Sequence, residues 1–389
     1  MPQKKILMIS PTPSHPQTAG NRARIFSLLD SIKSLGHDVH FLFLNREHGD
    51  IKAMQQYWGD NFLLIPYKHP SSRAKAFARK LKKYFGLKSA YTYKIDEWYD
   101  PSQDDDLKKI LDNIQFDVVI VEYIFFSRAL LQCNANTIKI IDTHDVFTDR
   151  HLRYLQQSQV PTWYSTSKKQ EAKGLNRADV IIAIQDHEAE HFKRISNKKV
   201  ITIGHMVPLC KLPINKAKPH RALYVGSNND INVQSVHYLI DKILPLVWKT
   251  SPQVELLLAG RICNAVKETK GIVLAGEVND LTKIYESASL VLNPMRFGTG
   301  LKIKTIEALG YGKPLITTSA GAEGLEKGAG KAFLVEDKEN DFASSMIELL
   351  NNPKRLREIS KEAYQFAESW NKECVNELDE LLKGTSINS

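Results

Sequence analysis

The sequence predicts an α/β protein made of two doubly wound parallel-sheet domains that face a cleft. Short, continuous apolar segments alternate with helical patterns in both halves of the chain, which is typical of parallel sheets covered on both faces. A proline-rich stretch without periodicity interrupts this alternation near the middle. With 389 residues, 42% of them hydrophobic, the chain is large enough to form two cores.

The first half of the chain predicts one such domain over residues 1–204. It opens with a strand at Lys5–Ser10, a polar loop, and an amphipathic helix from Asn21 to Leu35 that ends at Gly36. The further strands expected in this half are Val39–Leu44, Phe62–Ile65, Asp117–Val121, Ile138–Ile141, Val180–Ile184 and Val200–Ile203.

The second half predicts another domain over residues 221–370, after a linker at residues 205–220. The linker is expected because Gly204–His220 contains three prolines and no periodicity. The strands expected next are Ala222–Val225, Val254–Ala259, Ile272–Leu274, Leu290–Asn293, Leu315–Thr318 and Phe333–Val335, with helices at Asn232–Lys249, Leu281–Ser287 and Lys302–Tyr311. Residues 371–389 are expected to form a C-terminal helix that could pack back on the first domain.

The N-terminus and the cysteines favour a cytoplasmic protein. The first apolar run stops at Pro11, which is too short for a signal peptide, and no segment reaches the roughly 18 apolar residues of a membrane span. The four cysteines lie far apart, which predicts buried, reduced thiols instead of disulfides or zinc ligands: Cys133, Cys210, Cys263 and Cys374.

The positive charge is concentrated in one segment. Residues 61–95 contain nine basic residues and no acidic one, against a net charge of +9 for the whole chain. Residues 71–88 predict a helix with Phe77, Leu81, Tyr84 and Phe85 at helical spacing. Such a helix could contact an anionic membrane through Arg79, Lys80, Lys82 and Lys83, or it could be a solvated helix that packs its apolar residues on its own domain. Nucleic acid is not expected as a partner, because the aromatic residues are not interleaved as a base-stacking surface.

The segment from Asn293 to Thr318 predicts an anion site. A strand is followed by a loop with Gly298 and Gly300, and a helix begins near Leu301, so unpaired backbone N–H groups gather at a helix start. Lys302 and Lys304 add positive charge there. Glu307 lies about one turn further on and could accept hydrogen bonds from two ribose hydroxyls. The alternative is a purely structural turn.

This segment resembles the nucleotide-sugar site of glycosyltransferase family four, the glycosyl transferases group 1, whose members have the GT-B fold of two Rossmann-like domains. The residues that match the family pattern are Gly298, Gly300, Leu301, Lys304, Glu307, Ala308, Gly312 and Pro314. The resemblance implies that the loop backbone and the lysine hold a diphosphate, and that the glutamate holds the ribose.

The resemblance extends over most of the chain. Gly226 and Ser227 fall on the first loop of the family's donor domain, and Gly276 falls where the family turns beside the donor base. Gly20 and Asn21 match the glycine-rich loop that faces the donor phosphate in the family. His144, with Asp145 beside it, lies where the family places a histidine close to the transferred sugar, so the resemblance implies that these two residues are catalytic.

Two departures from the family pattern concern the donor site. The first of two signature glutamates, which contacts the transferred sugar in the family, is replaced by Thr299. The loop after Gly226 also lacks the arginine and lysine pair that many members place on the diphosphate. The sugar, and the division of roles between Lys302 and Lys304, are therefore left open.

Three further features have alternative interpretations. His144 follows an apolar strand and could be a core histidine bonded to backbone or a donor to the sugar or phosphate. Arg150 could belong to the same site or form a salt bridge. Asp104–Asp106 could bind a metal ion, but acidic residues at a helix start explain them better because they complement the helix dipole.

The predicted function is transfer of a hexose-like sugar from a nucleoside diphosphate donor to a glycan or lipid-linked saccharide of a cell-surface polysaccharide. The resemblance implies retention at the anomeric carbon and no need for a metal or other cofactor. A location at the inner face of the membrane would follow from the basic helix. The alternative is an inactive protein of the same fold that binds nucleotide or glycan; a phosphorylase would need pyridoxal phosphate, and no GxGxxG supports a nicotinamide enzyme.

Overall fold

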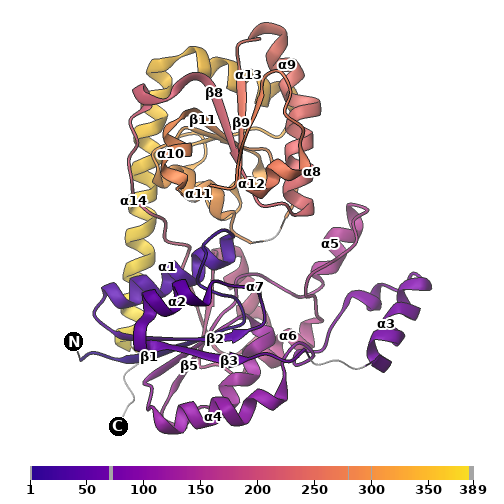
Figure 1. Cartoon of the computed structure of the whole chain (residues 1–389), viewed down its shortest axis with the longest axis vertical. Coiled ribbons are helices and arrows are strands. Elements are labelled where there is room, and N and C mark those ends of the chain that lie inside the picture. Colours follow the sequence, from indigo (N-terminus) through magenta and orange to yellow (C-terminus); the bar gives the residue numbers. More distant parts are fainter. Residues whose placement is uncertain (1, 70–72, 279, 299, 385–389) are drawn as a thin grey trace. The chain divides into compact units, whose positions relative to one another are not determined.

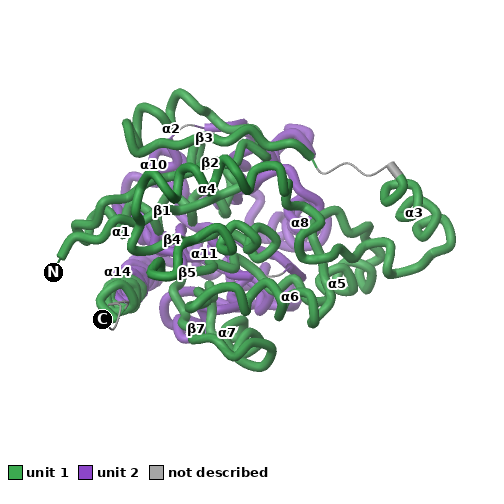
Figure 2. The backbone as a smooth tube through the Cα atoms, turned by 90° about the horizontal axis from the view of Figure 1, so that it is seen from below, with its two compact units in different colours: residues 1–204, 374–389 green, residues 205–373 purple. Residues whose placement is uncertain are grey.

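Two parallel sheets form the framework of the molecule (Figure 1). The computed structural model of the chain describes residues 2–69, 73–278, 280–298 and 300–384. The chain divides into two units: unit 1 comprises residues 1–204 and 374–389, and unit 2 comprises residues 205–373 (Figure 2). Each unit contains one of the sheets, so the predicted α/β class with two parallel-sheet domains is confirmed.

Within the described residues, unit 1 contains a seven-stranded sheet of order β3-β2-β1-β4-β5-β6-β7, and all its strand pairs are parallel. Its strands are β1 (Lys5–Ser10), β2 (Asp38–Asn45), β3 (Phe62–Pro66), β4 (Val118–Glu122), β5 (Ile138–Asp142), β6 (Val180–Ala183) and β7 (Lys199–Thr202). Its α-helices are α1 (Gly20–Ser34), α2 (Ile51–Trp58), α3 (Arg73–Tyr84), α4 (Asp104–Asn113), α5 (Arg150–Gln156), α6 (Lys168–Leu175) and α7 (Asp186–Ile195). The short 3-10 helices are η1 (Gly59–Asn61), η2 (Lys88–Tyr91), η3 (Pro101–Gln103) and η4 (Ile124–Gln132).

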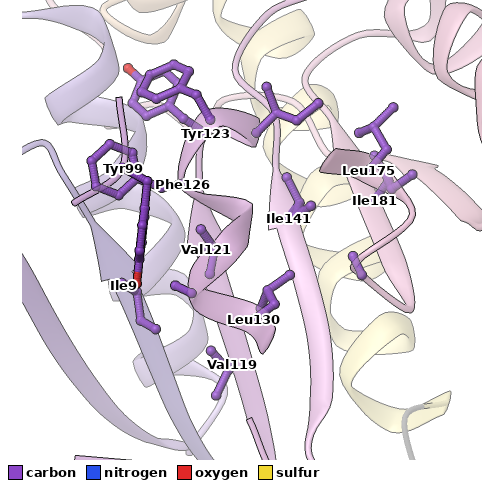
Figure 3. Close-up of a cluster of buried hydrophobic side chains, with 14 of the residues drawn as sticks. Ile9, Tyr99, Val119, Val121, Tyr123, Phe126, Leu130, Ile141, Leu175 and Ile181 are labelled. Carbon is purple, nitrogen blue, oxygen red and sulfur yellow. The ribbon is translucent and has the colours of Figure 1, made fainter. Parts of the chain in front are cut away.

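The core of unit 1 follows from the two-residue period of its strands. Alternate residues such as Val119 and Val121 of β4 project from one face of the sheet, beside Ile9, Ile141 and Ile181 of neighbouring strands (Figure 3). The residues between them in each strand are buried as well. Both faces are therefore covered, which is why these strands are continuously apolar.

Unit 2 contains, in its described part, a six-stranded parallel sheet of order β10-β9-β8-β11-β12-β13. Its strands are β8 (Lys218–Val225), β9 (Glu255–Ala259), β10 (Ile272–Gly276), β11 (Ala288–Asn293), β12 (Leu315–Thr317) and β13 (Leu334–Val335). Its helices are η5 (Ile214–Lys216), α8 (Asp230–Tyr238), η6 (Leu239–Ile243), α9 (Leu244–Thr250), η7 (Arg261–Ala265), α10 (Leu281–Glu286), α11 (Ile303–Gly310), α12 (Ser319–Ala322), η8 (Glu326–Gly328) and α13 (Glu339–Asn351).

Several predicted boundaries differ from those of the structure. The helix expected at Asn232–Lys249 is interrupted by the π-helical turn η6, just before Pro245, which lacks the N–H that a continuous helix would use. The helix expected near Leu301 begins at Ile303, with Lys302 as its N-cap. Strand β8 begins at Lys218, inside the predicted linker.

The C-terminal helix is longer than the sequence predicted. Helix α14 runs without a break from Pro353 to Gly384. Its residues up to Glu373 belong to unit 2, and those from Cys374 onward belong to unit 1. The buried residues of this second part are Cys374, Leu378, Leu381 and Leu382.

The cysteines and the apolar segments agree with most of the expectations. All four cysteines, each within the described residues, are free, and Cys263 and Cys374 are buried as predicted. Cys133 is only half-buried, and Cys210 is exposed because it lies in the irregular segment before β8. None of the helices in the described ranges combines the length and the apolar character needed to cross a bilayer. The Asp104–Asp106 run starts α4, as expected, and Asp104 pairs with Arg128.

Candidate functional site

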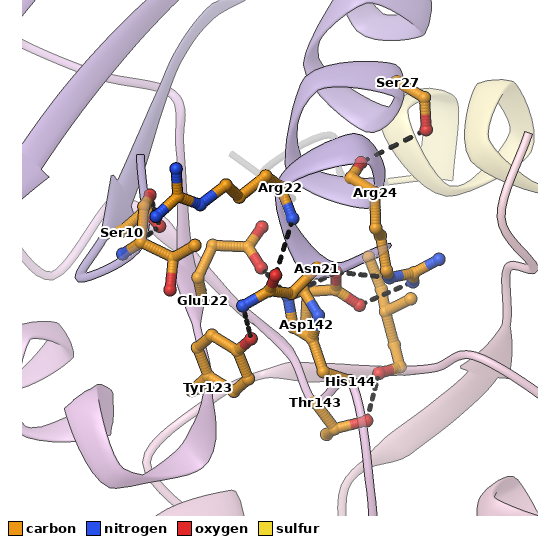
Figure 4. Close-up of polar contacts among 12 residues, drawn as sticks. Ser10, Asn21, Arg22, Arg24, Ser27, Glu122, Tyr123, Asp142, Thr143 and His144 are labelled. Carbon is orange, nitrogen blue, oxygen red and sulfur yellow. Dashed lines mark hydrogen bonds and ion pairs between the residues drawn. The ribbon is translucent and has the colours of Figure 1, made fainter. Parts of the chain in front are cut away.

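In unit 1, His144 lies at the carboxyl edge of the sheet, two residues after β5 (Figure 4). Its Nε2 is hydrogen-bonded to the Glu122 carboxylate and lies 3.6 Å from Asp142 Oδ2. The ring stacks on Tyr123 with 4.1 Å between centroids, and the backbone of both residues has positive φ, 60° and 67°. His144 Nε2 is thus bonded to a buried carboxylate, and such strained backbone is common at functional sites.

The carboxylates beside His144 form a buried, charged group. Glu122 and Asp142 end the neighbouring strands β4 and β5 and are partners in the sheet register. Arg24 of α1 donates two hydrogen bonds to Asp142, at 2.8 and 2.6 Å. Burial and the charge of Asp142 raise the pKa of Glu122 to about 7, although His144 and Arg24 oppose this shift. Glu122 can therefore hold a proton near neutral pH.

The same three acidic and imidazole groups could in principle hold a metal ion. Glu122, Asp142 and His144 each offer one ligand atom, and these three atoms lie within 4.8 Å of one another. However, the buried guanidinium of Arg24 already occupies both oxygens of Asp142. A divalent cation would have to compete with this charge, so an ion-pair network fits the residues better than a metal centre.

The other candidates of unit 1 surround this group. Gly20 is the first residue of α1, and Asn21 donates a hydrogen bond of 3.0 Å from Nδ2 to Tyr123 Oη. Asp145, which the sequence marked as catalytic, forms an ion pair of 2.9 Å with Arg150. The salt-bridge interpretation of Arg150 is therefore confirmed, and Asp145 is committed to that pair while His144 is committed to Glu122.

In unit 2, the loop between β11 and α11 is fixed by buried polar contacts. Asn293 donates to Thr305 Oγ1 at 2.9 Å, and Thr305 donates to Gly321 O at 2.9 Å. Gly298 and Gly300 both have positive φ, 151° and 72°. Leu301 is buried, and Thr299 lies outside the described residues. The loop thus joins the ends of β11 and β12 to the first turn of α11.

Lys302 and Lys304 have different environments. Lys302 is buried; its Nζ donates to Gly300 O and lies 3.2 Å from Glu323 Oε2, so its charge is neutralised within the loop. Lys304 donates only to neutral groups, Asn232 Oδ1 at 2.8 Å and Tyr224 Oη at 3.1 Å. No acidic partner of Lys304 is found among the described residues, so this lysine is the one available to an anion.

Burial, together with the nearby charge of Lys302, lowers the pKa of Lys304 to about 7. The ammonium also lies 4.5 Å above the ring of Tyr224. A half-buried cation with neutral partners is stabilised when an anion binds beside it. Lys304 therefore has the properties of a phosphate ligand at a helix start.

Glu307 lies one turn after Lys304 on α11. It accepts a hydrogen bond of 3.0 Å from Tyr285 Oη, and Tyr285 stacks on Tyr311 with 4.4 Å between centroids. Burial raises the pKa of Glu307 to about 7, although the bond from Tyr285 opposes the shift. Within the described ranges no cation pairs with this carboxylate, which leaves its other oxygen able to accept from a ligand hydroxyl.

The remaining donor candidates lie on the loops that follow β8 and β10. Asn232 donates to Ser227 O at 3.0 Å, which connects Ser227 to Lys304 through one side chain. A Cβ on Gly260 would lie 2.5 Å from Gly226 O, and Gly260 N donates to Gly276 O at 2.8 Å. The structure therefore gathers Gly226, Ser227 and Gly276 at the edge of the sheet where α11 begins.

Some residues of both clusters were not singled out from the sequence. In unit 1 these are Arg24 and Glu122, and in unit 2 they are Tyr224, Asn232, Tyr285 and Glu323. Glu122 had a usable signal, because an acidic residue that ends a fully apolar strand lies beside the strand that ends in Asp142. Arg24 and Tyr285 had none, since they sit in ordinary helical patterns.

The basic residues assigned to membrane contact lie on α3. Lys80, Lys82 and Lys83 are exposed. Arg79 instead forms an ion pair of 2.9 Å with Glu97, and its guanidinium lies 3.9 Å from the ring centroid of Tyr93. Arg79 therefore attaches α3 to the rest of unit 1. Its assignment as a membrane contact stays a prediction.

Most of unit 2 matches the model of a known protein family. The family model of the glycosyl transferases group 1 matches residues 219–352, which include every donor candidate from Gly226 to Glu307. The chain carries a group 1 glycosyltransferase domain. Over 388 residues the chain is also 22% identical to an uncharacterised 44.6 kDa protein in the cps region of Klebsiella pneumoniae, covering 93% of this chain and 95% of that protein.

Solved structures extend the likeness to the whole chain. The pneumococcal O-GlcNAc transferase GtfA, in complex with UDP and GlcNAc, has a TM-score of 0.69 and 12% identity over 98% of this chain and 99% of its own. HepE of Anabaena, in complex with UDP and glucose, has a TM-score of 0.67 and 14% identity, and the match covers 98% of this chain and 100% of HepE. A TarM variant of S. aureus, in complex with UDP, has a TM-score of 0.68 and 12% identity, and the match covers 96% of this chain and 100% of TarM. The group 1 domain thus belongs to a chain with the GT-B fold.

Proposed function

We propose that this protein transfers a hexose from a nucleoside diphosphate donor to a saccharide acceptor. The observation that carries the proposal is the pair Lys304 and Glu307 at the start of α11. One is a cation without an acidic partner and the other a carboxylate without a basic partner, among the described residues. A diphosphate would pair with the lysine, and the hydroxyls of a ribose would bond to the glutamate.

We propose a uridine nucleotide as the donor, because HepE, GtfA and the TarM variant were each solved with UDP. The cps-region relative and the likeness to the lipopolysaccharide outer core galactosyltransferase WaaB support an acceptor that belongs to a cell-surface polysaccharide, free or lipid-linked. A lipid-linked acceptor would require the protein to work at the inner face of the membrane.

The proposed transfer retains the configuration of the anomeric carbon. The leaving diphosphate accepts the proton of the acceptor hydroxyl, so the protein supplies positioning and charge stabilisation instead of a strong base. In this scheme Lys304 and the N–H groups of the loop at Gly300 stabilise the diphosphate. His144, held by Glu122, donates a hydrogen bond to the sugar or phosphate. No metal ion is needed, because the ammonium takes the place of a divalent cation.

Calorimetric titration with UDP tests the donor site. Lys304→Met and Glu307→Gln should each weaken UDP binding about a hundredfold or more, because each removes a charged hydrogen bond. Neither change should lower the melting temperature, since both remove a charge whose burial is unfavourable. Lys327→Met, at an exposed lysine of the same unit, is the matched control and should bind UDP normally.

A donor-hydrolysis assay separates the enzyme from an inactive protein of the same fold. Wild-type protein should slowly hydrolyse UDP-sugar in the absence of acceptor, and the Lys304→Met protein should not. Binding of UDP without any hydrolysis would favour the inactive alternative. Normal UDP binding by both variants would refute the site itself.

A further inference from the structure

Helix α3 presents its apolar side chains to solvent. Phe77 is 68% exposed, Leu81 47% and Tyr84 83%, and Phe85 just after the helix is 65% exposed. Their spacing places all four on one side of the helix. The alternative that α3 packs these residues on its own domain is therefore wrong, and an unburied aromatic face of this size indicates a binding surface.

The opposite side of α3 attaches the helix to unit 1. Arg79 is bound to Glu97 and Tyr93, as described above, and Lys83 lies 5.1 Å from the ring centroid of Tyr91. Arg79 thus holds α3 from one side, while the apolar side faces solvent and Lys80, Lys82 and Lys83 are exposed. In an ordinary surface helix the apolar side would instead pack on the protein. In both views α3 stands away from the sheet of its own unit (Figures 1 and 2).

The charge around this face selects an anionic partner. Lys80 and Lys82 are exposed at its borders, and the segment 61–95 contains no acidic residue. A second copy of the chain would bring an equally basic helix against this one, so like charges would oppose a dimer through α3. Aromatic side chains beside lysines suit the boundary between lipid headgroups and acyl chains.

We propose that α3 docks unit 1 on an anionic lipid bilayer. Phe77, Leu81, Tyr84 and Phe85 enter the boundary between headgroups and acyl chains, and Lys80 and Lys82 contact lipid phosphates. Arg79 holds the helix to unit 1 through Glu97 and Tyr93. The docking itself does not depend on the proposed function. Only its purpose does, which is to bring the protein to a lipid-linked acceptor.

Sedimentation of the full-length protein with vesicles tests this docking. Wild-type protein should bind vesicles of equal parts phosphatidylcholine and phosphatidylglycerol, and bind pure phosphatidylcholine much more weakly. The exposed triple change Phe77→Ser, Tyr84→Ser and Phe85→Ser should reduce binding about tenfold or more. Lys80→Gln with Lys82→Gln should reduce binding severalfold, and only to the anionic vesicles.

A matched control uses exposed apolar residues elsewhere in the chain. Leu131→Ser, Val160→Ser and Leu209→Ser change residues that are 58%, 62% and 41% exposed, and should leave vesicle binding unchanged. Equal binding by wild type and the α3 triple variant, or no preference for phosphatidylglycerol, would overturn the proposal. So would a lipid-free dimer that the triple variant loses, since a second copy would then cover the face.

Calorimetry with UDP in the absence of vesicles keeps the two proposals apart. The α3 variants should bind UDP as well as wild type, which also shows that they are folded. If wild-type protein binds vesicles but not UDP, the donor-site proposal fails and the docking surface stands. If it binds UDP but not vesicles, the reverse holds.

Discussion

Lys304 and Glu307 lie three positions apart on α11, and burial shifts their pKa values in opposite directions to about 7. Each shift disfavours the charged form in the free protein. A structural pair would have relieved this cost by bonding to each other, yet within the part of the chain that the structure describes each side chain bonds only to neutral groups. At the scale of the residue, the two charges are therefore better explained by a ligand than by the fold.

The pH dependence of donor binding follows from Lys304. Free protein loses the lysine proton as pH rises through about 7, and a bound diphosphate restores it. In a Glu307→Gln background, which removes the opposing titration, affinity for UDP-glucose should fall about tenfold per pH unit above pH 7. Isothermal titration in buffers of different ionisation enthalpy should also show proton uptake.

Lys304→Arg provides the control for this pH dependence, because a guanidinium stays charged throughout the range. Affinity that falls equally in the Lys304→Arg protein would assign the titration to another group. UDP-glucose is the right probe, since its diphosphate has no ionisation near neutral pH.

At the scale of the element, the loop before α11 depends on glycine where the backbone turns. Gly298 and Gly300 have positive φ, and a Cβ on Gly298 would lie 3.2 Å from both Lys302 Cε and Met295 Sδ. Lys302 then closes the loop by binding Gly300 O and Glu323. These contacts hold Gly300 and Lys302 in place before any ligand arrives, which reduces the entropy cost of binding.

Gly300→Ala should weaken UDP binding about tenfold, because a Cβ in the left-handed region costs about 1–2 kcal/mol and displaces the loop. Gly330→Ala is the matched control: Gly330 has φ 76° against 72° for Gly300, and its Cβ would meet no atom within 4 Å. Both variants should melt slightly earlier than wild type, but only Gly300→Ala should lose affinity in the UDP titration. Equal affinity of the two variants would remove the loop from the donor site.

At the scale of the whole molecule, unit 1 is not one continuous stretch of the chain. Unit 1 is formed by residues 1–204 together with the last residues of the chain, and α14 carries the chain back to it after unit 2 is complete. Leu378 and Leu382 are buried in this returning part. The stability of unit 1 should therefore depend on residues from 374 onward, 170 positions along the chain from residue 204, where the first part of the unit ends.

Leu378→Ala should destabilise the protein by about 2–5 kcal/mol, the usual cost of emptying a fully buried leucine site. Glu377→Ala, at the exposed neighbouring position, should change stability little. Thermal unfolding followed by circular dichroism measures both, and UDP binding by the folded Leu378→Ala protein should be normal. A melting temperature for Leu378→Ala equal to that of Glu377→Ala would show that this end of α14 is not part of the unit 1 core.

Periodicity alone located most strands of both sheets, and β1 was predicted to the residue. A strand or helix is specified by neighbours along the chain, so its signal is local. The Gly298–Glu307 segment was also readable, because loop, lysine and glutamate are consecutive on one turn and one helix. In contrast, the exposed face of α3 could not be predicted, since the same amphipathic pattern describes a packed helix and an unpacked one.

The sequence by itself determined the α/β class, the order of the strands along the chain and the segment that carries the donor candidates. The tertiary structure alone decided which charges have partners. Lys302 pairs with Glu323, whereas Lys304 does not pair with an acid in the described part of the chain. His144 is bonded to Glu122, and Arg79 to Glu97. The physical reason is that two charges pair only when they are close in space. In parallel sheets the crossover connections bring together residues that lie far apart along the chain, so the sequence does not show which charges will meet.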